Sequence, residues 1–153
     1  VPVRRLVFLA AFLPVPGKSA MDQRSTEPID PPAIATTSEW TDLGEDVWSI
    51  GPDTARELFL HDVAGDVAAS AIERLRPQCY RVMTEMTPLT AWPDVPSDYV
   101  VCADDRALSA AWGRRASRDR LGVGAIELPG GHCPMLSRPD QLATTLDRLA
   151  RGS

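Results

Sequence analysis

Two short stretches of this sequence carry side chains that could move a proton. Asp104 and Asp105 end the apolar, β-branched run that starts at Tyr99, and His132 follows two glycines at the end of the run that starts at Val123. A carboxylate that binds one imidazole nitrogen fixes the tautomer and leaves the other nitrogen free to accept a proton from a nucleophile. An aspartate and a histidine in this arrangement predict the acid–base pair of a nucleophilic enzyme. The alternative is an exposed turn acid and a loop histidine without a chemical role.

The elements that would position these side chains follow from the rhythm of the last third of the chain. Apolar, β-branched runs alternate there with segments of helical periodicity, which predicts strand, helix, strand and helix at residues 98–105, 107–122, 123–132 and 137–152. This order is typical of a parallel α/β sheet with right-handed crossovers. Functional groups in such a sheet gather at the carboxyl ends of the strands, so Asp105 and His132 are expected to face one crevice.

The last predicted helix has clear boundary signals. Ser137 is the expected N-cap, Pro139 suits the first turn, and Gly152 suits the exit. Its expected buried stripe consists of Leu142, Leu146 and Leu149.

The start of the chain has two interpretations. Its apolar run, Leu6–Leu13, is too short to cross a bilayer, because a spanning helix needs about 20 apolar residues. One interpretation is a buried parallel strand at Leu6–Phe12, apolar on both faces because helices cover both sides of such a sheet. The other is a secretory signal at residues 1–20. The strand is favoured, because Lys18 stands where a signal needs a small residue before its cleavage site.

Composition limits the class of protein. The 153 residues are 44% hydrophobic and 24% charged, as in a soluble globular domain, and the net charge is −5. An excess of acidic residues argues against nucleic-acid binding, because phosphate contacts need a surplus of Lys and Arg. Three cysteines, an odd number without C-x-x-C spacing, indicate reduced thiols and a cytoplasmic location. With two histidines a metal centre is not expected, and no cofactor motif or membrane span is predicted.

Residues 20–95 separate the first predicted strand from the others, and they predict a lid. The stretch 22–52 is rich in Pro, Asp, Thr and Ser, which indicates an irregular chain with turns. Two short helices are expected at 54–63 and 67–76, each capped by the aspartate directly in front of it.

Four segments together carry a resemblance to a known family. They are LVFLAAFLPVPGKS at 6–19, FLHDVAGDVAASAIERLRPQ at 59–78, YVVCADDRALS at 99–109 and ELPGGHCPMLSRPDQLA at 127–143. In this order they cover nearly the whole chain and resemble the α/β-hydrolases, within them the small esterases similar to plant methylesterases and hydroxynitrile lyases. The combination is specific, although each segment alone is not.

The resemblance implies a partial α/β-hydrolase fold. About three parallel strands, the sixth to eighth of the family's sheet, would carry flanking helices and a small, mostly helical cap. Residues 1–19 would be the core strand and its exit loop, 20–95 the cap, and 96–153 the C-terminal α/β core with the acid and the histidine.

By the same resemblance, Asp105 matches the triad acid and His132 the triad base of a carboxylic ester hydrolase. Ala11, Phe12 and Leu13 would line the substrate pocket. The family's nucleophile is a serine in a G-x-S-x-G turn, and no such motif occurs in this sequence. Strands one to five, the serine and the oxyanion hole are therefore expected before residue 1, and the chain alone is expected to be inactive.

One position separates two reactions within the family. Members that cleave cyanohydrins carry a lysine directly after the triad histidine, and this sequence has Cys133 there. The resemblance therefore implies hydrolysis of a small carboxylic ester. A cysteine nucleophile is not expected, because Cys133 adjoins His132 on a turn, where neighbouring side chains point apart, and Cys102 lies inside a predicted strand as a buried thiol.

Two other classes of protein stay open. Without a neighbour on its outer side, the strand Leu6–Phe12 would expose an apolar edge that pairs with a second chain, as in a dimer or a non-catalytic binding module. The second class is a secreted protein from which residues 1–20 are removed.

Overall fold

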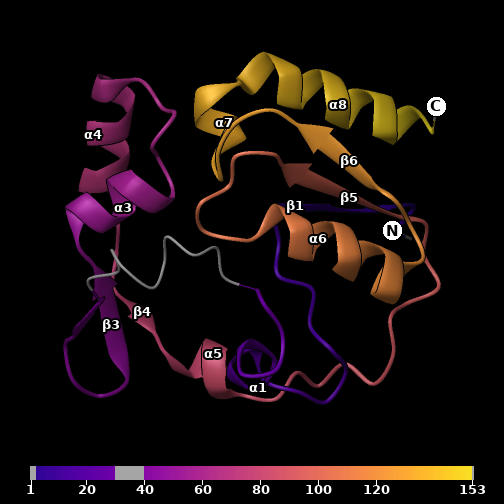
Figure 1. The fold of residues 1–153 in the computed structure, drawn as a ribbon, viewed down its shortest axis with the longest axis horizontal. Coiled ribbons are helices and arrows are strands. Elements are labelled where there is room, and N and C mark those ends of the chain that lie inside the picture. Colours follow the sequence, from indigo (N-terminus) through magenta and orange to yellow (C-terminus); the bar gives the residue numbers. More distant parts are fainter. Residues whose placement is uncertain (1–2, 30–39, 153) are drawn as a thin grey trace.

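The computed structural model describes residues 3–29 and 40–152, and its centre is a parallel sheet (Figure 1). The three strands are β1 (Leu6–Leu9), β5 (Ser97–Cys102) and β6 (Ala125–Leu128). They are ordered β1-β5-β6, and both neighbouring pairs run parallel. The predicted fold class, about three parallel strands with flanking helices, is confirmed.

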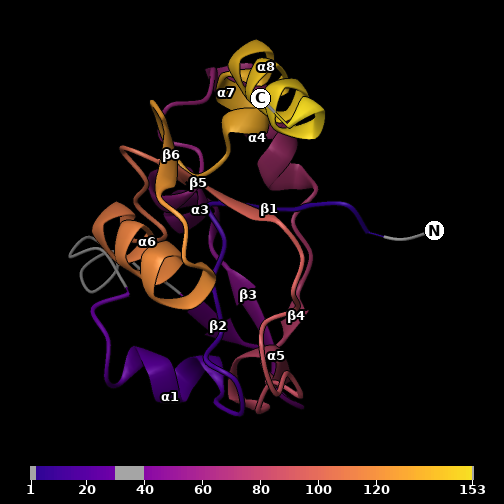
Figure 2. The same cartoon turned by 90° about the vertical axis from the view of Figure 1, so that its right-hand side faces the viewer.

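The central strand β5 is buried on both faces because helices cover both sides of the sheet (Figure 2). Tyr99 and Val101 point to the face covered by α6 (Ala110–Ala116), and Val100 points to the face covered by α8 (Pro139–Arg151). This alternation follows from the two-residue period of a strand. It explains why β5 is apolar at successive positions instead of at every second one.

The helices begin and end at residues suited to these positions. The hydroxyl of Ser109 accepts a hydrogen bond from the N–H of Trp112 and caps α6. A single π-helical turn, Ser117–Leu121, extends α6 and ends at Gly122, whose φ is +68°. Helix α8 has Pro139 in its first turn and ends at Gly152, with a φ of +75°.

Two details predicted for the last helix are wrong. Ser137 ends the short helix α7 (Pro134–Ser137) instead of capping α8, and Arg138 occupies the cap position. In the stripe, Leu142 and Leu149 are buried, but Leu146 is 39% exposed and Thr145 lies on the inner face. The buried face of the helix therefore contains Leu142, Thr145 and Leu149, at spacings of three and four residues.

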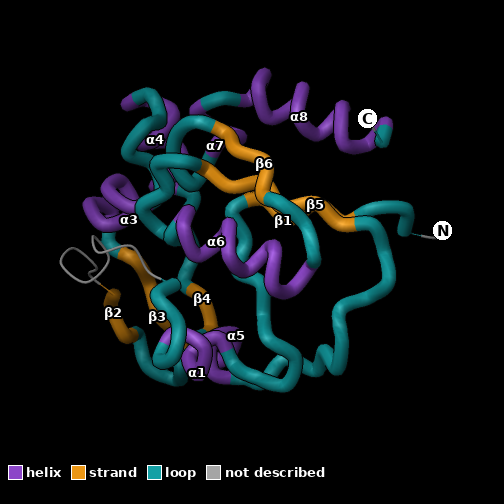
Figure 3. Tube along the Cα trace, turned by 45° about the vertical axis from the view of Figure 1, so that its right-hand side comes forward, coloured by secondary structure: helices purple, strands orange, loops and turns teal. Residues whose placement is uncertain are grey.

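Between β1 and β5 the chain forms four helices and a second, antiparallel sheet within the described residues (Figure 3). The elements in chain order are α1 (Ala20–Arg24), β2 (Trp40–Asp42), β3 (Val47–Ile50), α3 (Pro52–Leu58), α4 (Gly65–Glu73), β4 (Gln78–Cys79) and α5 (Arg81–Thr84). The strands are ordered β2-β3-β4. The irregular chain predicted for 22–52 is wrong where β2 and β3 form, and residues 30–39 lie outside the described part.

The caps predicted for α3 and α4 are also wrong. Gly51 and Ala64 occupy these positions, and neither helix has a side-chain cap. Asp53 and Asp66 lie in the first turn instead, where a carboxylate favours the positive end of the helix dipole.

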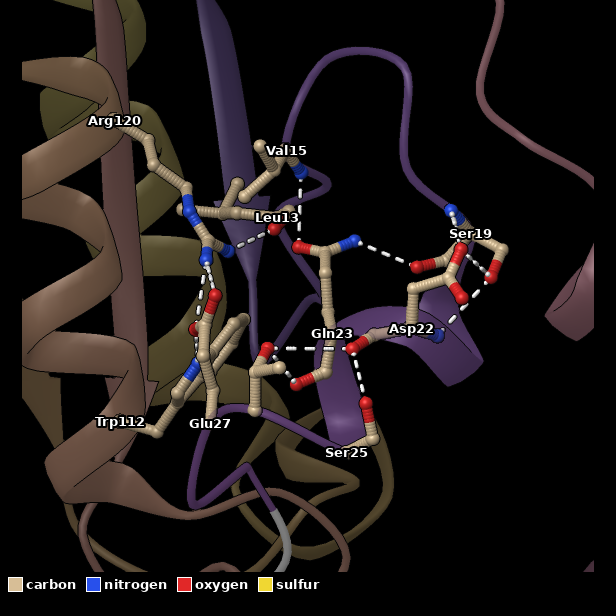
Figure 4. Close-up of polar contacts among 10 residues, drawn as sticks. Leu13, Val15, Ser19, Asp22, Gln23, Ser25, Glu27, Trp112 and Arg120 are labelled. Carbon is tan, nitrogen blue, oxygen red and sulfur yellow. Dashed lines mark hydrogen bonds and ion pairs between the residues drawn. The ribbon is translucent and has the colours of Figure 1, made fainter.

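The chain that follows β1 is tied to α6 by a buried polar network (Figure 4). The carboxylate of Glu27 accepts two hydrogen bonds from Arg120, at 2.6 and 2.7 Å, and one from the indole of Trp112 at 2.7 Å. Arg120 also donates to the carbonyl of Leu13. Gln23, which has no exposed surface, accepts from the Val15 N–H. These contacts tie the segment from Leu13 to Glu27 to α6 and the π-helical turn that extends it.

Candidate active site

The predicted pairing of Asp105 and His132 is present. Asp105 Oδ2 and His132 Nδ1 are 2.8 Å apart, the Asp105 side chain is 2% exposed, and the His132 side chain is 25% exposed. The other carboxylate oxygen, Oδ1, accepts hydrogen bonds from the N–H groups of Ala107 and Leu108 at 2.8 and 2.9 Å. These two bonds fix the carboxylate, so its orientation does not depend on the imidazole.

Each member of the pair follows the carboxyl end of a strand. Asp105 comes three residues after β5, and His132 comes four residues after β6. The two strands are neighbours and run parallel, so their ends meet at one edge of the sheet. The turn before the histidine needs glycine at Gly130, because its φ is +94°.

The imidazole of His132 presents its second nitrogen away from the acid. No described residue forms a hydrogen bond with Nε2. The ring of Phe59 packs edge-on against the imidazole, with centroids 5.2 Å apart and an interplanar angle of 72°. This contact and the bond to Asp105 hold the ring from two sides, and Nε2 stays available to a reacting group.

Sequence reasoning gave no role to the residues that hold the histidine turn. Asp62 accepts a hydrogen bond from the Gly131 N–H at 2.9 Å and forms an ion pair with Arg138. His61 Nε2 donates to the carbonyl of Asp104 at 3.1 Å. The residues of these pairs are 43 to 76 positions apart, so spacing along the chain could not have indicated the contacts.

The predicted pocket residues Ala11, Phe12 and Leu13 follow β1 at the same edge of the sheet. The Leu13 side chain has no exposed surface and lies in the core cluster, and a pocket role for it stays a prediction. Phe12 stacks on Trp112 with ring centroids 5.4 Å apart, and the carbonyl of Ala11 accepts from the Tyr99 hydroxyl. A pocket role for Ala11 and Phe12 stays a prediction.

The cysteines near the site are poor nucleophiles. Burial, with a further contribution from the charge of Asp105, raises the pKa of the Cys102 thiol to about 12. Burial also raises the pKa of the Cys133 thiol. A thiol reacts as its thiolate, so neither residue is activated at neutral pH.

One hollow in the described residues lies away from the pair. Its volume is about 340 Å³, and it is lined by Met21, Arg24, Trp40, Trp48, Gln78, Cys79, Tyr80, Val82 and Met83. It belongs to α1, α5 and the antiparallel sheet, and it contains neither Asp105 nor His132. Among residues 3–29 and 40–152 no three His, Cys, Asp or Glu side chains gather as metal ligands. None of the described helices is long and apolar enough to cross a bilayer.

Comparisons with known proteins, by sequence and by structure, point to the same family. The chain is 29% identical to an α/β hydrolase, nvfD, of Aspergillus novofumigatus over 98% of its length and 58% of the fungal protein. The structure matches polyneuridine aldehyde esterase with a TM-score of 0.78 at 15% identity, over 97% of this chain and 62% of that one. It matches the methylesterase MES16 from Arabidopsis with a TM-score of 0.75 at 18% identity, over 99% and 60% of the respective chains.

The chain thus spans about 60% of the length of the proteins that it matches. A family model described as the alpha/beta hydrolase family matches residues 1–145, nearly the whole sequence. Together with the parallel sheet and its strand order, this match shows that the chain belongs to the α/β-hydrolase family.

Proposed function

We propose that this chain supplies the acid and the general base of a serine-type carboxylic ester hydrolase. The observation that carries the proposal is the 2.8 Å contact between a buried Asp105 carboxylate and Nδ1 of His132, whose Nε2 has no described partner. Asp105 keeps the proton on Nδ1 and stabilises the imidazolium that forms when Nε2 accepts a proton.

In this mechanism a serine hydroxyl attacks the ester carbonyl while Nε2 of His132 takes the hydroxyl proton. The same imidazole returns the proton to the leaving alcohol, which gives an acyl-enzyme. Water then attacks the acyl group with His132 again as the base, and the free acid leaves. Cys133 next to the histidine brings no cation, which favours hydrolysis over a reaction that expels cyanide.

We propose that the serine and the oxyanion hole lie outside residues 1–153. The lack of a G-x-S-x-G motif supports this, as does the coverage of about 60% of the related proteins. The sheet gives a third reason: β1 is an edge strand with only β5 beside it among the described residues.

The first test uses the chain alone. It should neither hydrolyse p-nitrophenyl acetate above the rate of free imidazole nor react with a fluorophosphonate probe, because the nucleophile and the oxyanion donors supply the largest rate terms. A labelled serine within residues 1–153 would contradict the proposal.

The second test uses a continuous protein in which a segment with G-x-S-x-G precedes this chain. His132→Ala and Asp105→Ala should each lower kcat by about 10³ or more while the serine is still present. Asp147→Asn is the control, since Asp147 forms an exposed ion pair on α8. Turnover that persists without His132 would contradict its role as the base.

A further inference from the structure

Residues 59–63, between α3 and α4, pack against the histidine turn. Phe59 packs edge-on against the His132 ring, and Leu60 and Val63 form a buried cluster against which Cys133 packs. The polar residues between them, at positions 61 and 62, contact the turn from the same side. One segment of the cap region thus contacts the histidine and the residues on both sides of it.

Asp62 makes the polar contacts that tie this segment to the turn. Its Oδ2 atom accepts from the Gly131 N–H at 2.9 Å and from Arg138, and its side chain is 14% exposed. Burial acts to raise the pKa of Asp62, but the hydrogen bonds from the Gly131 N–H and from Arg138 hold it below the ordinary value. The carboxylate therefore stays ionised at neutral pH.

The fit at this contact leaves no free space. A Cβ atom on Gly131 would lie 2.7 Å from Asp62 Oδ1 and 2.6 Å from His61 Nε2. The N–H of Gly130 is held separately, by Asp104 Oδ2 at 3.1 Å. Both glycines before the histidine are thus fixed by carboxylates, Asp62 from the segment between α3 and α4 and Asp104 from the turn after β5 that also carries Asp105.

We propose that Asp62 is a positioning residue for His132. By binding the N–H directly before the histidine and the guanidinium of Arg138 beyond α7, it holds the turn where Nδ1 meets Asp105 and Nε2 stays free. A hydrogen bond weakens steeply as its length and angle depart from the optimum, so a small displacement of the turn would break the 2.8 Å contact. The catalytic consequence rests on the function proposed above, whereas the positioning itself concerns this chain alone.

The two oxygens of Asp62 give a matched pair of variants. Oδ1 is buried and has no hydrogen-bond partner among the described residues. In Asp62→Asn the amide oxygen can take the place of Oδ2, with the NH₂ group at the unpartnered position, so both contacts are kept without the charge. Asp62→Ala removes both contacts.

The test measures the imidazole directly. The chain contains two histidines, so ¹⁵N-histidine labelling gives two ring systems, which His132→Gln assigns. In the unmodified chain Nδ1 of His132 should be protonated, with a hydrogen-bonded N–H signal. Asp62→Ala should lose this signal, mix the two tautomers and speed exchange of the Gly131 N–H by about tenfold or more. Asp62→Asn should keep the signal.

Two further variants keep the outcome interpretable. Asp147→Ala, which removes an exposed ion pair on α8, should change nothing. If Asp62→Ala does not fold, Arg138→Met removes one of the two contacts and should still broaden the Nδ1–H signal. A folded Asp62→Ala or Arg138→Met variant with an unchanged His132 signal would overturn the proposal.

Failure of the proposed function gives results that differ from failure of the positioning role of Asp62. If the unmodified chain lacks the Nδ1–H signal, the Asp105–His132 pair itself is absent. In a continuous protein with the serine, Asp62→Ala should lower kcat with little change in KM, and Asp62→Asn should recover most of the rate. If the unmodified protein shows no turnover that depends on His132, the proposed function is rejected. The positioning role of Asp62 is then decided by the Nδ1–H signal alone.

Discussion

Asp105 binds three donors, and the division between its two oxygens determines how a variant would behave. Oδ1 holds the N–H groups of Ala107 and Leu108, while Oδ2 alone meets the imidazole. An asparagine can keep the contacts of Oδ1. Its NH₂ group would then face His132 Nδ1 and donate, so the imidazole would have to move its own proton to Nε2.

We therefore predict that Asp105→Asn keeps the fold and reverses the tautomer of His132. In ¹⁵N spectra Nε2 should become the protonated nitrogen, and in a complete enzyme kcat should fall by about 10⁴, because Nε2 could no longer accept a proton. Asp104→Asn is the control: its carboxylate accepts only from the Gly130 N–H at this site, and its amide oxygen can do the same. An unchanged Nδ1–H signal in Asp105→Asn would refute the prediction.

The three thiols should react in an order set by exposure and pKa. Cys79 is exposed, Cys133 is half-buried with a raised pKa, and Cys102 is buried with a pKa of about 12. At pH 8 we expect Cys79 to react first with a disulfide reagent, Cys133 later, and Cys102 only after unfolding. Mass spectrometry of the timed reaction measures this order.

The raised pKa of Cys102 also predicts a pH dependence of stability. The folded chain holds the thiol proton more tightly than the unfolded chain, so this contribution is complete below the unfolded thiol's pKa and is lost as the pH rises toward about 12. The midpoint of urea unfolding should fall between pH 8 and pH 10.5, and Cys102→Ala should reduce this fall. An equal fall in both proteins would show that other groups cause it.

At the scale of elements, the C-terminal third could be predicted well because its signals are strong and local. The strand β5 is apolar at successive positions, α8 has thirteen residues with an apolar stripe, and Gly122 and Gly152 mark the helix ends. The antiparallel sheet could not be predicted, since β2, β3 and β4 have three, four and two residues. A strand that short has too few positions to show an alternation.

The residues of the candidate site also fall into two groups, those that the sequence predicts and those that it does not. Asp105 and His132 could be predicted because parallel strands bring their carboxyl ends to one edge. Phe59 and Asp62 could not, since they approach from the segment between α3 and α4 and their packing depends on tertiary contacts with no local pattern. Gly131 leaves room for Asp62 only because it lacks a side chain, since a Cβ atom there would lie 2.7 Å from Asp62 Oδ1.

The turn between β6 and α7 should be sensitive to a single methyl group. Gly130 and Gly122 both have positive φ, so alanine costs about 1–2 kcal/mol of unfolding free energy at either position. At Gly130 the new Cβ would also meet Arg138 and lie 2.6 Å from Asp62 Oδ2, whereas at Gly122 nothing lies within 4 Å. We predict a larger loss for Gly130→Ala than for Gly122→Ala in urea unfolding. Equal losses would mean that the ion pair moves aside without cost.

At the scale of the whole molecule, the edge strands β1 and β6 each pair only with β5 among the described residues, and the outer side of β1 is an open edge. The N–H groups of Leu6 and Ala10 donate to β5 and its flanks, at Pro96 and Val100. Because N–H groups alternate along a strand, those of Val7 and Leu9 point to the other side. No described strand pairs with β1 there. An edge of this kind can be completed by another segment or by a second chain.

We therefore predict that the chain alone associates with itself as its concentration rises, as light scattering after size-exclusion chromatography would measure. Val7→Pro should weaken this association, because proline removes a donor on the open edge and leaves the pairing with β5 intact. Val7→Thr is the control: it keeps the N–H and the β-branched shape and reduces only the apolar surface at a side chain that is 36% exposed. Association weakened equally by both variants would indicate side-chain contact instead of strand pairing. A wild-type chain that stays monomeric at every concentration would contradict edge pairing altogether and leave the open edge for a segment of the same protein.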